Sequence, residues 1–322
     1  MGSRYLEMGV KFAAVFPGQG SQVVGMGADV SEKSSAARDV FDRAAATLGY
    51  DLLELQKHGP ETKLRETQFS QPAIFVTNLA LYYAGGETIK PTVSAGHSFG
   101  EFCSLTISGS IGFEEALRLV DARGKAMQYA AELAPGGMTA VLGLDAAQIR
   151  EVAAHVESET GGRVQLANFN SPSQIVISGD AAAVQAAADA MLEKGAKRVV
   201  PLNVSGAWHS RLMEPAAQRF AAAVDAARFD LPAFDVVSNV DAKPYRDVQT
   251  IKKNLIRSVT EEVRWHETAG ALLTYGLDLV VEFGASPVLG PLMRRLPNAV
   301  EGLNVTDFAG VEKFREKLSV HA

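Results

Sequence analysis

Short apolar runs alternate with helical patterns along most of the chain. Val10–Phe16 is an apolar run that stops at a Pro-Gly-Gln-Gly turn, and Thr92–Gly96 is a short strand-like run that ends in Gly-His-Ser-Phe-Gly. Both runs predict buried strands, whereas the longer apolar segment Pro72–Ala84 predicts a buried helix. Phe234–Val240 and Leu277–Gly284 are also strand-like, and a helical pattern follows each. This alternation is typical of an α/β fold with a mainly parallel sheet.

One stretch in the middle of the chain has a different order of elements. Its predicted strands and helices follow the order β-α-β-β-α-β, which is that of ferredoxin-like domains. The segments are strand Met138–Leu144, helix Ala146–Glu159, strand Val164–Asn168, strand Gln174–Ser178, helix Ala181–Lys194 and strand Arg198–Val204. We therefore predict a ferredoxin-like small domain at 135–205, inserted into a larger α/β domain formed by 1–134 and 206–322.

The composition is that of an ordinary folded protein. Of 322 residues, 47% are apolar and 21% are charged, which excludes a disordered or fibrous chain. No apolar window of 18 residues predicts a membrane span. Residues 1–7 lack the apolar region of a secretory signal and are expected to be a leader ahead of a start at Met8.

Charge and cysteine content narrow the partners and the compartment. A net charge of −6 argues against nucleic acid as a main partner. Cys103 is the only cysteine, so an internal disulfide is excluded and a reducing cytoplasm is favoured. The chain has no His-x-x-x-His or His-Glu-x-x-His pattern and no clustered carboxylates, so we expect no metal site.

The sharpest chemical motif is Gly96-His97-Ser98-Phe99-Gly100, a Gly-x-Ser-x-Gly pattern between a predicted strand and a predicted helix. Its glycines permit a sharp turn that lifts the serine hydroxyl out of the sheet. At a helix N-terminus, the dipole and free N–H groups stabilise an oxyanion. The pentapeptide alone is a weak signal, and a plain glycine-rich turn is the alternative. Its place at a strand-to-helix corner makes Ser98 a candidate nucleophile.

A serine nucleophile needs a base, normally a histidine, and the chain has six. Four of them are predicted to be solvated or structural: His58, His155, His266 and His321. His97 adjoins Ser98, but adjacent residues on such a turn point apart, so we expect His97 to brace the turn. His209 remains, directly after the predicted small domain, and is the candidate base.

Two other polar segments allow more than one interpretation. The glycine-rich loop Phe16–Gln22 matches neither nucleotide-binding motif, because Val23 stands at the third glycine position and Met26-Gly27 stand where Lys and Ser/Thr are needed. We expect this loop to face the serine turn and to offer a backbone N–H to an oxyanion. Arg123 lies on a mostly apolar helical segment, where the pattern alone favours an exposed arginine paired with an acid.

Taken together, these segments resemble malonyl-CoA:acyl carrier protein transacylases, the acyltransferases that supply malonyl units to fatty acid synthesis. The resemblance extends from about Lys11 to Leu296. The matching segments are Phe16–Gln22, Gln71-Pro72-Ala73, Gly96–Glu101, Arg123-Gly124 with Met127, Gly137-Met138, Asn168–Pro172, Ser205–Ser210 with Leu212-Met213, Ser238-Asn239-Val240 and Val263-Arg264-Trp265.

The resemblance implies a role for individual residues. Ser98 would be the nucleophile and His209 the base. The backbone N–H groups of Gln19 and Phe99 would form the oxyanion hole. Arg123 would bind the malonyl carboxylate with two parallel hydrogen bonds, a geometry that suits guanidinium and not the lysine ammonium.

The family also orients its histidine with a backbone carbonyl rather than an acid, and Ser258 stands at the matching position. The implied fold is a hydrolase-like α/β core with an inserted ferredoxin-like domain. Several positions depart from the family, and two of them adjoin Ser98 and His209 in the sequence. Phe99 stands where Leu, Ile or Val is usual, so its ring is expected to narrow the pocket. Trp208 stands where Phe is usual, which leaves the choice of extender unit open.

The implied reaction moves a malonyl group from malonyl-CoA to the phosphopantetheine thiol of acyl carrier protein, through a malonyl-serine intermediate and without a cofactor. A serine thioesterase or esterase, and a polyketide-pathway acyltransferase with a different extender unit, are the alternatives. A cytoplasmic monomer is expected, with no membrane or nucleic-acid partner. Because carriers of this pathway are acidic, docking requires a local basic patch. The candidates for that patch are Lys197, Arg198, Arg294 and Arg295.

Overall fold

The computed structural model describes residues 9–86 and 89–319, so the predictions for residues 1–8 and for His321 lie outside the described part. Five strands form one sheet in the order β7-β2-β1-β8-β9, and all neighbouring strands are parallel. They are β1 (Phe12–Phe16), β2 (Val93–Gly96), β7 (Asp235–Val237), β8 (Leu279–Phe283) and β9 (Glu301–Val305). The predicted α/β class with a mainly parallel sheet is confirmed.

Helices cover both faces of this sheet. β1 is buried along its whole length, and its alternate side chains enter two different cores. Phe12, Ala14 and Phe16 belong to the larger core, whereas Ala13 and Val15 belong to a second core on the opposite face. The uninterrupted apolar run of this strand therefore reflects burial on both sides, as in other parallel sheets.

The larger core draws on most of the helices. These helices are α1 (Ala28–Lys33), α2 (Ser35–Leu48), α3 (Leu52–His58), α4 (Glu61–Arg65), α5 (Thr67–Gly85), α6 (Glu101–Ile107), α7 (Phe113–Leu133), α10 (Glu214–Ala226), α11 (Val248–Arg257) and α14 (Phe308–Ser319). The second core is formed with α12 (Trp265–Leu273) and α13 (Leu289–Met293). Within the described ranges, no helix has the length and apolarity of a membrane-spanning segment.

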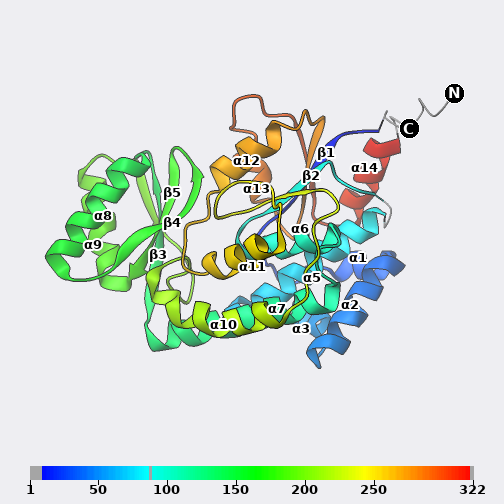
Figure 1. Ribbon diagram of the computed structural model, residues 1–322, viewed down its shortest axis with the longest axis horizontal. Helices are drawn as coiled ribbons and strands as arrows, with labels where there is room; N and C mark the ends of the chain where they lie inside the picture. Colours follow the sequence, from blue (N-terminus) through cyan, green and yellow to red (C-terminus); the bar gives the residue numbers. More distant parts are fainter. Residues whose placement is uncertain (1–8, 87–88, 320–322) are drawn as a thin grey trace.

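A second sheet has four antiparallel strands in the order β4-β5-β3-β6. Its elements are β3 (Gly136–Leu142), α8 (Ala146–Thr160), β4 (Val164–Ser171), β5 (Gln174–Asp180), α9 (Ala181–Glu193) and β6 (Arg198–Pro201). Together they have the predicted β-α-β-β-α-β order, and α8 and α9 form a separate core with the strands. Figure 1 shows this unit in green at one end of the molecule.

Several predicted elements have different bounds in the structure, and one strand was not predicted. β6 ends at Pro201 rather than Val204, because the chain leaves the sheet there and runs toward His209. α5 begins at Thr67, five residues before the predicted start, and Pro72 lies inside it. β9 was not predicted, because Glu301–Val305 is mostly exposed or half-buried and carries no apolar run.

Candidate active site

Ser98 lies at the corner between β2 and α6, in the short 3-10 turn Ser98–Gly100. Its φ of 55° is in the left-handed region, where a non-glycine residue is strained. Gly96 and Gly100 were predicted to permit a sharp turn, but the structure requires glycine at these positions for a different reason. A Cβ on Gly96 would lie 1.9 Å from the carbonyl carbon of Gly100, and one on Gly100 would lie 2.4 Å from the carbonyl oxygen of Phe16. The glycines therefore permit close backbone packing, while the strain lies at Ser98 itself.

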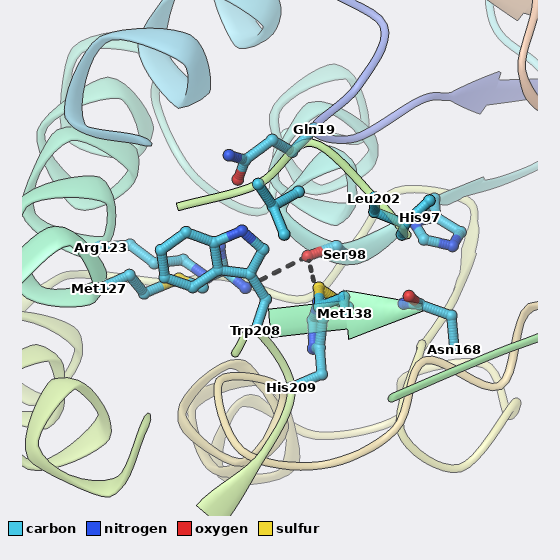
Figure 2. A pocket seen from close by; sticks show the side chains of 11 residues that line it. Gln19, His97, Ser98, Arg123, Met127, Met138, Asn168, Leu202, Trp208 and His209 are labelled. Atoms are coloured by element: carbon cyan, nitrogen blue, oxygen red, sulfur yellow. Dashed lines mark hydrogen bonds between the residues drawn. The ribbon is translucent and has the colours of Figure 1, made fainter. Parts of the chain in front are cut away.

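His209 is hydrogen-bonded to Ser98, with 2.8 Å between His209 Nε2 and Ser98 Oγ (Figure 2). On the other side of the ring, His209 Nδ1 lies 2.7 Å from the carbonyl oxygen of Ser258 and 3.2 Å from that of Glu261. Carbonyl oxygens only accept hydrogen bonds, so Nδ1 carries the proton of the neutral ring. This tautomer leaves Nε2 free to accept the proton of the Ser98 hydroxyl.

The protonation state of His209 suits a base. Only 4% of the side chain is exposed. Burial, together with the nearby positive charge of Arg123 and with His97, lowers the pKa of His209 to about 3. The imidazole is therefore neutral at pH 7 and able to accept a proton.

The sequence pattern alone predicted that Arg123 is exposed and paired with an acid, and this prediction is wrong. The side chain is 0% exposed, not solvated, because α7 packs between α5 and α10. Nη1 donates to Oε1 of Gln71 at 2.9 Å, and Nη2 donates to Oγ of Ser98 at 3.3 Å. Both partners are neutral, and Nε has no hydrogen-bond partner among the described residues.

The charge of Arg123 is retained despite this burial. Burial lowers the pKa of Arg123 to about 10, and the charge of Glu101 opposes that effect. The guanidinium is thus charged at pH 7. A buried cation with neutral partners and an unpaired N–H is the environment in which an incoming carboxylate is bound strongly.

These groups line one pocket of about 80 Å³. Figure 2 shows Ser98 between Arg123 and His209 and joined to each by a hydrogen bond. The lining residues are Gln19, His97, Ser98, Arg123, Met127, Met138, Asn168, Leu202, Val204, Trp208 and His209. Met138 is on β3 and Asn168 is on β4 of the four-stranded sheet, whereas Ser98 follows β2 of the five-stranded sheet, so both sheets contribute to the pocket.

The remaining predicted residues occupy different surroundings. Gln19 follows β1 and lines the pocket, because the ends of the neighbouring strands β1 and β2 lie at one edge of the sheet. The side chain of Phe99 lies in the larger core and is absent from the pocket lining. The prediction that its ring narrows the pocket is therefore wrong. The four basic docking candidates are exposed, and none of them lines the pocket: Lys197, Arg198, Arg294 and Arg295.

Three of the other histidines have partners other than Ser98. Nε2 of His97 lies 3.0 Å from Oδ1 of Asn170, and its ring approaches Trp265. His58 and His155 are exposed beside acidic residues of their own helices. Across the described ranges, no three His, Cys, Asp or Glu side chains are gathered as metal ligands.

A buried polar group that the sequence motifs did not reveal supports the serine. Asn239 Oδ1 accepts a hydrogen bond from the Ser98 N–H, and Asn239 Nδ2 donates to the Ser98 carbonyl, both at 3.1 Å. The Asn239 N–H donates to Glu101 at 2.8 Å, and the Tyr245 hydroxyl donates to the same carboxylate. Burial raises the pKa of Glu101, and these hydrogen bonds oppose that effect. In the sequence, Asn239 and Glu101 are marked only by their places in two of the segments that match the family, Ser238-Asn239-Val240 and Gly96–Glu101.

A strained serine beside a neutral, oriented histidine supports attack on an acyl carbon. The α/β core and this pair define the class of serine-dependent acyltransferases and hydrolases. Residues 14–313 match the acyl transferase domain family. The malonyl CoA-acyl carrier protein transacylase of Haemophilus influenzae is 40% identical over 310 residues, which cover 94% of this chain and 99% of that protein. The chain belongs to the acyl transferase family and, within it, to the malonyl CoA-acyl carrier protein transacylases.

Solved structures agree with this assignment. The malonyl CoA-acyl carrier protein transacylase of Coxiella burnetii superposes with a TM-score of 0.92 and is 36% identical, covering 97% of this chain and 98% of that chain. A type II PKS malonyl-transacylase, solved in complex with its acyl-carrier protein, superposes with a TM-score of 0.90 at 39% identity, covering 95% of this chain and 99% of that chain.

Proposed function

We propose that this protein transfers a malonyl group from malonyl-CoA to the phosphopantetheine thiol of acyl carrier protein, through an ester on Ser98. The observation that carries the proposal is the buried Arg123 guanidinium, which is 3.3 Å from the Ser98 hydroxyl and whose Nε–H has no hydrogen-bond partner in the part of the chain that the structure describes. An acyl group that ends in a carboxylate would pair with this cation and present its thioester carbonyl to Ser98. The names of the relatives support malonyl as that group.

In the first half-reaction, Nε2 of His209 takes the proton of Ser98 as Oγ attacks the thioester carbon. The new C–O bond forms, and the carbonyl electron pair moves to oxygen. The backbone N–H groups of Gln19 and Phe99 are the proposed donors to this oxyanion. When the carbonyl re-forms, the C–S bond breaks and the coenzyme A thiolate takes the proton from His209.

The second half-reaction repeats these steps with a different nucleophile. The phosphopantetheine thiol gives its proton to His209 and attacks the ester carbon, and Ser98 leaves with that proton. The Ser258 carbonyl accepts the hydrogen bond from His209 Nδ1 and thereby stabilises the imidazolium formed in each half-reaction. Water in place of the thiol would give free malonate, which is the reaction of the thioesterase alternative.

A chase experiment separates transfer from hydrolysis. Protein that has been mixed with malonyl-CoA and freed of excess reagent is divided between buffer and holo-acyl carrier protein. We expect malonyl-carrier to form rapidly and free malonate to form slowly. Malonate release at the same rate in both samples would support a hydrolase instead.

The carrier protein is proposed to dock on exposed basic residues. Arg198 is the first residue of β6 and Lys197 precedes it; Arg198 is four residues before Leu202 of the pocket, or about 13 Å along an extended chain. Arg294 and Arg295 follow α13 and are also exposed. Since the chain carries a net charge of −6, an acidic partner depends on such local charges.

Reversing Lys197 and Arg198 to Glu is expected to raise the KM for the carrier and to flatten its salt dependence, because exposed charges act mainly on encounter. The rate of Ser98 acylation by malonyl-CoA should be unchanged. Reversal of two other exposed lysines, Lys253 and Lys313, makes the same change in net charge and serves as the control. An unchanged carrier KM at low salt would place docking on another face. The same reversal at Arg294 and Arg295 tests the second pair.

The cellular setting and domain division are part of the same proposal. We propose a cytoplasmic monomer that acts in fatty acid synthesis, and the single buried cysteine, Cys103, supports a reducing compartment. We also propose that 135–205 is a separate small domain inserted between 1–134 and 206–322. The four-stranded sheet and its own core support this division.

A further inference from the structure

The backbone of His209 is strained in the same way as that of Ser98. Its φ is 58°, in the left-handed region that non-glycine residues rarely occupy. Such a conformation persists only where surrounding contacts hold it. At Ser98 those contacts come from the side-chain amide of Asn239, which bonds both the N–H and the carbonyl of the serine.

An amide side chain from the small domain holds the main chain around His209. Gln165 lies on β4, and its Nε2 donates to the carbonyl oxygen of His209 at 3.3 Å. Its Oε1 accepts from the N–H of Arg211 at 2.9 Å. The two ends of this amide therefore hydrogen-bond to the main chain on both sides of residue 210.

The same glutamine reaches the segment that orients the imidazole ring. Gln165 Nε2 also donates to the carbonyl of Thr260 at 3.2 Å. Ser258 and Glu261, on either side of Thr260, supply the carbonyls that face His209 Nδ1. Gln165 thus joins the main chain of the base to the loop that fixes its ring.

β4 is tied to this loop by backbone hydrogen bonds as well. The N–H of Phe169 donates to the carbonyl of Val263, and the N–H of Val263 donates to the carbonyl of Ala167, both at 2.8 Å. The loop is therefore attached to the small domain whatever residue stands at 165. Replacing Gln165 should leave that attachment in place and free only the His209 main chain.

We propose that Gln165 is a positioning residue that acts from the small domain to hold His209 in line with Ser98, an inference that rests on the proposed acyl transfer. Gln165 does not line the pocket, and its effect is exerted through the carbonyl of His209. Loss of this hydrogen bond frees the base to move away from the serine hydroxyl. A misplacement of about 1 Å costs on the order of 100-fold in rate.

Two variants test the donor function of the amide. Gln165→Met keeps the length of the side chain without hydrogen bonds, and Gln165→Glu keeps an acceptor for Arg211 while losing the donor to His209. For both, we expect the rate of Ser98 acylation at saturating malonyl-CoA to fall about 10-fold or more. The malonyl-CoA concentration for half-maximal rate should change less than about twofold, because Arg123 and the pocket are untouched.

Gln185→Leu is the matched control, because Gln185 is an exposed glutamine of the same small domain whose side chain bonds Asp189 on its own helix. It should acylate at the wild-type rate. Wild-type acylation rates in both Gln165 variants would overturn the positioning role. So would a change in the malonyl-CoA concentration for half-maximal rate without a change in the rate at saturation. Full activity in Gln165→Glu alone would also overturn it, because the contact to Arg211 would then suffice. Absence of a malonyl ester in the wild-type protein would instead refute the proposed function.

Discussion

Replacing Arg123 with Ala is expected to slow malonyl transfer strongly while sparing or improving acetyl transfer. The guanidinium is buried and, among the described residues, bonds only neutral groups, so its strongest partner would be the substrate carboxylate. A bidentate contact of this kind contributes about 1.5–3 kcal/mol, or about 10- to 150-fold. Acetyl-CoA has no carboxylate and leaves the buried charge unpaired, so it gains when the charge is removed.

The comparison requires both substrates and a control arginine. Acylation rates with malonyl-CoA and acetyl-CoA are measured for wild type, Arg123→Ala and Arg118→Ala, which removes an exposed arginine from the same helix. Arg118→Ala should retain the wild-type preference. An equal loss with both substrates in Arg123→Ala would show that Arg123 is structural and that the carboxylate is bound elsewhere.

Replacing His209 with Ala is expected to reduce Ser98 acylation by about 10²- to 10⁴-fold, the usual contribution of a general base. The affinity for malonyl-CoA should change little, because Arg123 remains in place. His155→Ala is the control, since His155 is an exposed histidine beside Glu159 on α8. Acylation at the wild-type rate in His209→Ala would exclude His209 as the base.

The pH dependence of the wild-type protein checks the same assignment. Because the pKa of His209 is lowered to about 3, the base form persists well below the pH at which a solvated histidine becomes protonated. Acylation at low malonyl-CoA should therefore stay constant from pH 8 to about pH 5 and fall only in stronger acid. A decline centred near pH 6.5 would mean that the base is solvated.

Much of the fold was predictable because the burial of an element determines the pattern of apolar residues along it. β1 and β8 are covered on both faces; β1 is an uninterrupted apolar run, and β8 is apolar apart from the buried Glu282. The small domain was predictable because its helices and strands have different apolar periods. β9 was not predictable, because an edge strand with exposed residues such as Glu301 lacks either pattern.

The candidate site was only partly predictable, for a different reason. Ser98 is marked by a local motif, but the burial of Arg123 depends on how α7 packs between two other helices. Asn239 bonds Ser98 across 141 positions in sequence, and Gln165 bonds His209 across 44. A local pattern contains no information on such contacts, so the residues that hold the backbone of Ser98 and His209 became apparent only in the structure.

The measurement that tests the account most directly is the mass of the intact protein after mixing with malonyl-CoA, followed by mapping of the modified peptide. We predict one added malonyl group on Ser98 in the wild-type protein and none in Ser98→Ala, because Ser98 alone is hydrogen-bonded to both His209 and Arg123 among the described residues. A malonyl group that persists in Ser98→Ala and maps to another residue would contradict the account.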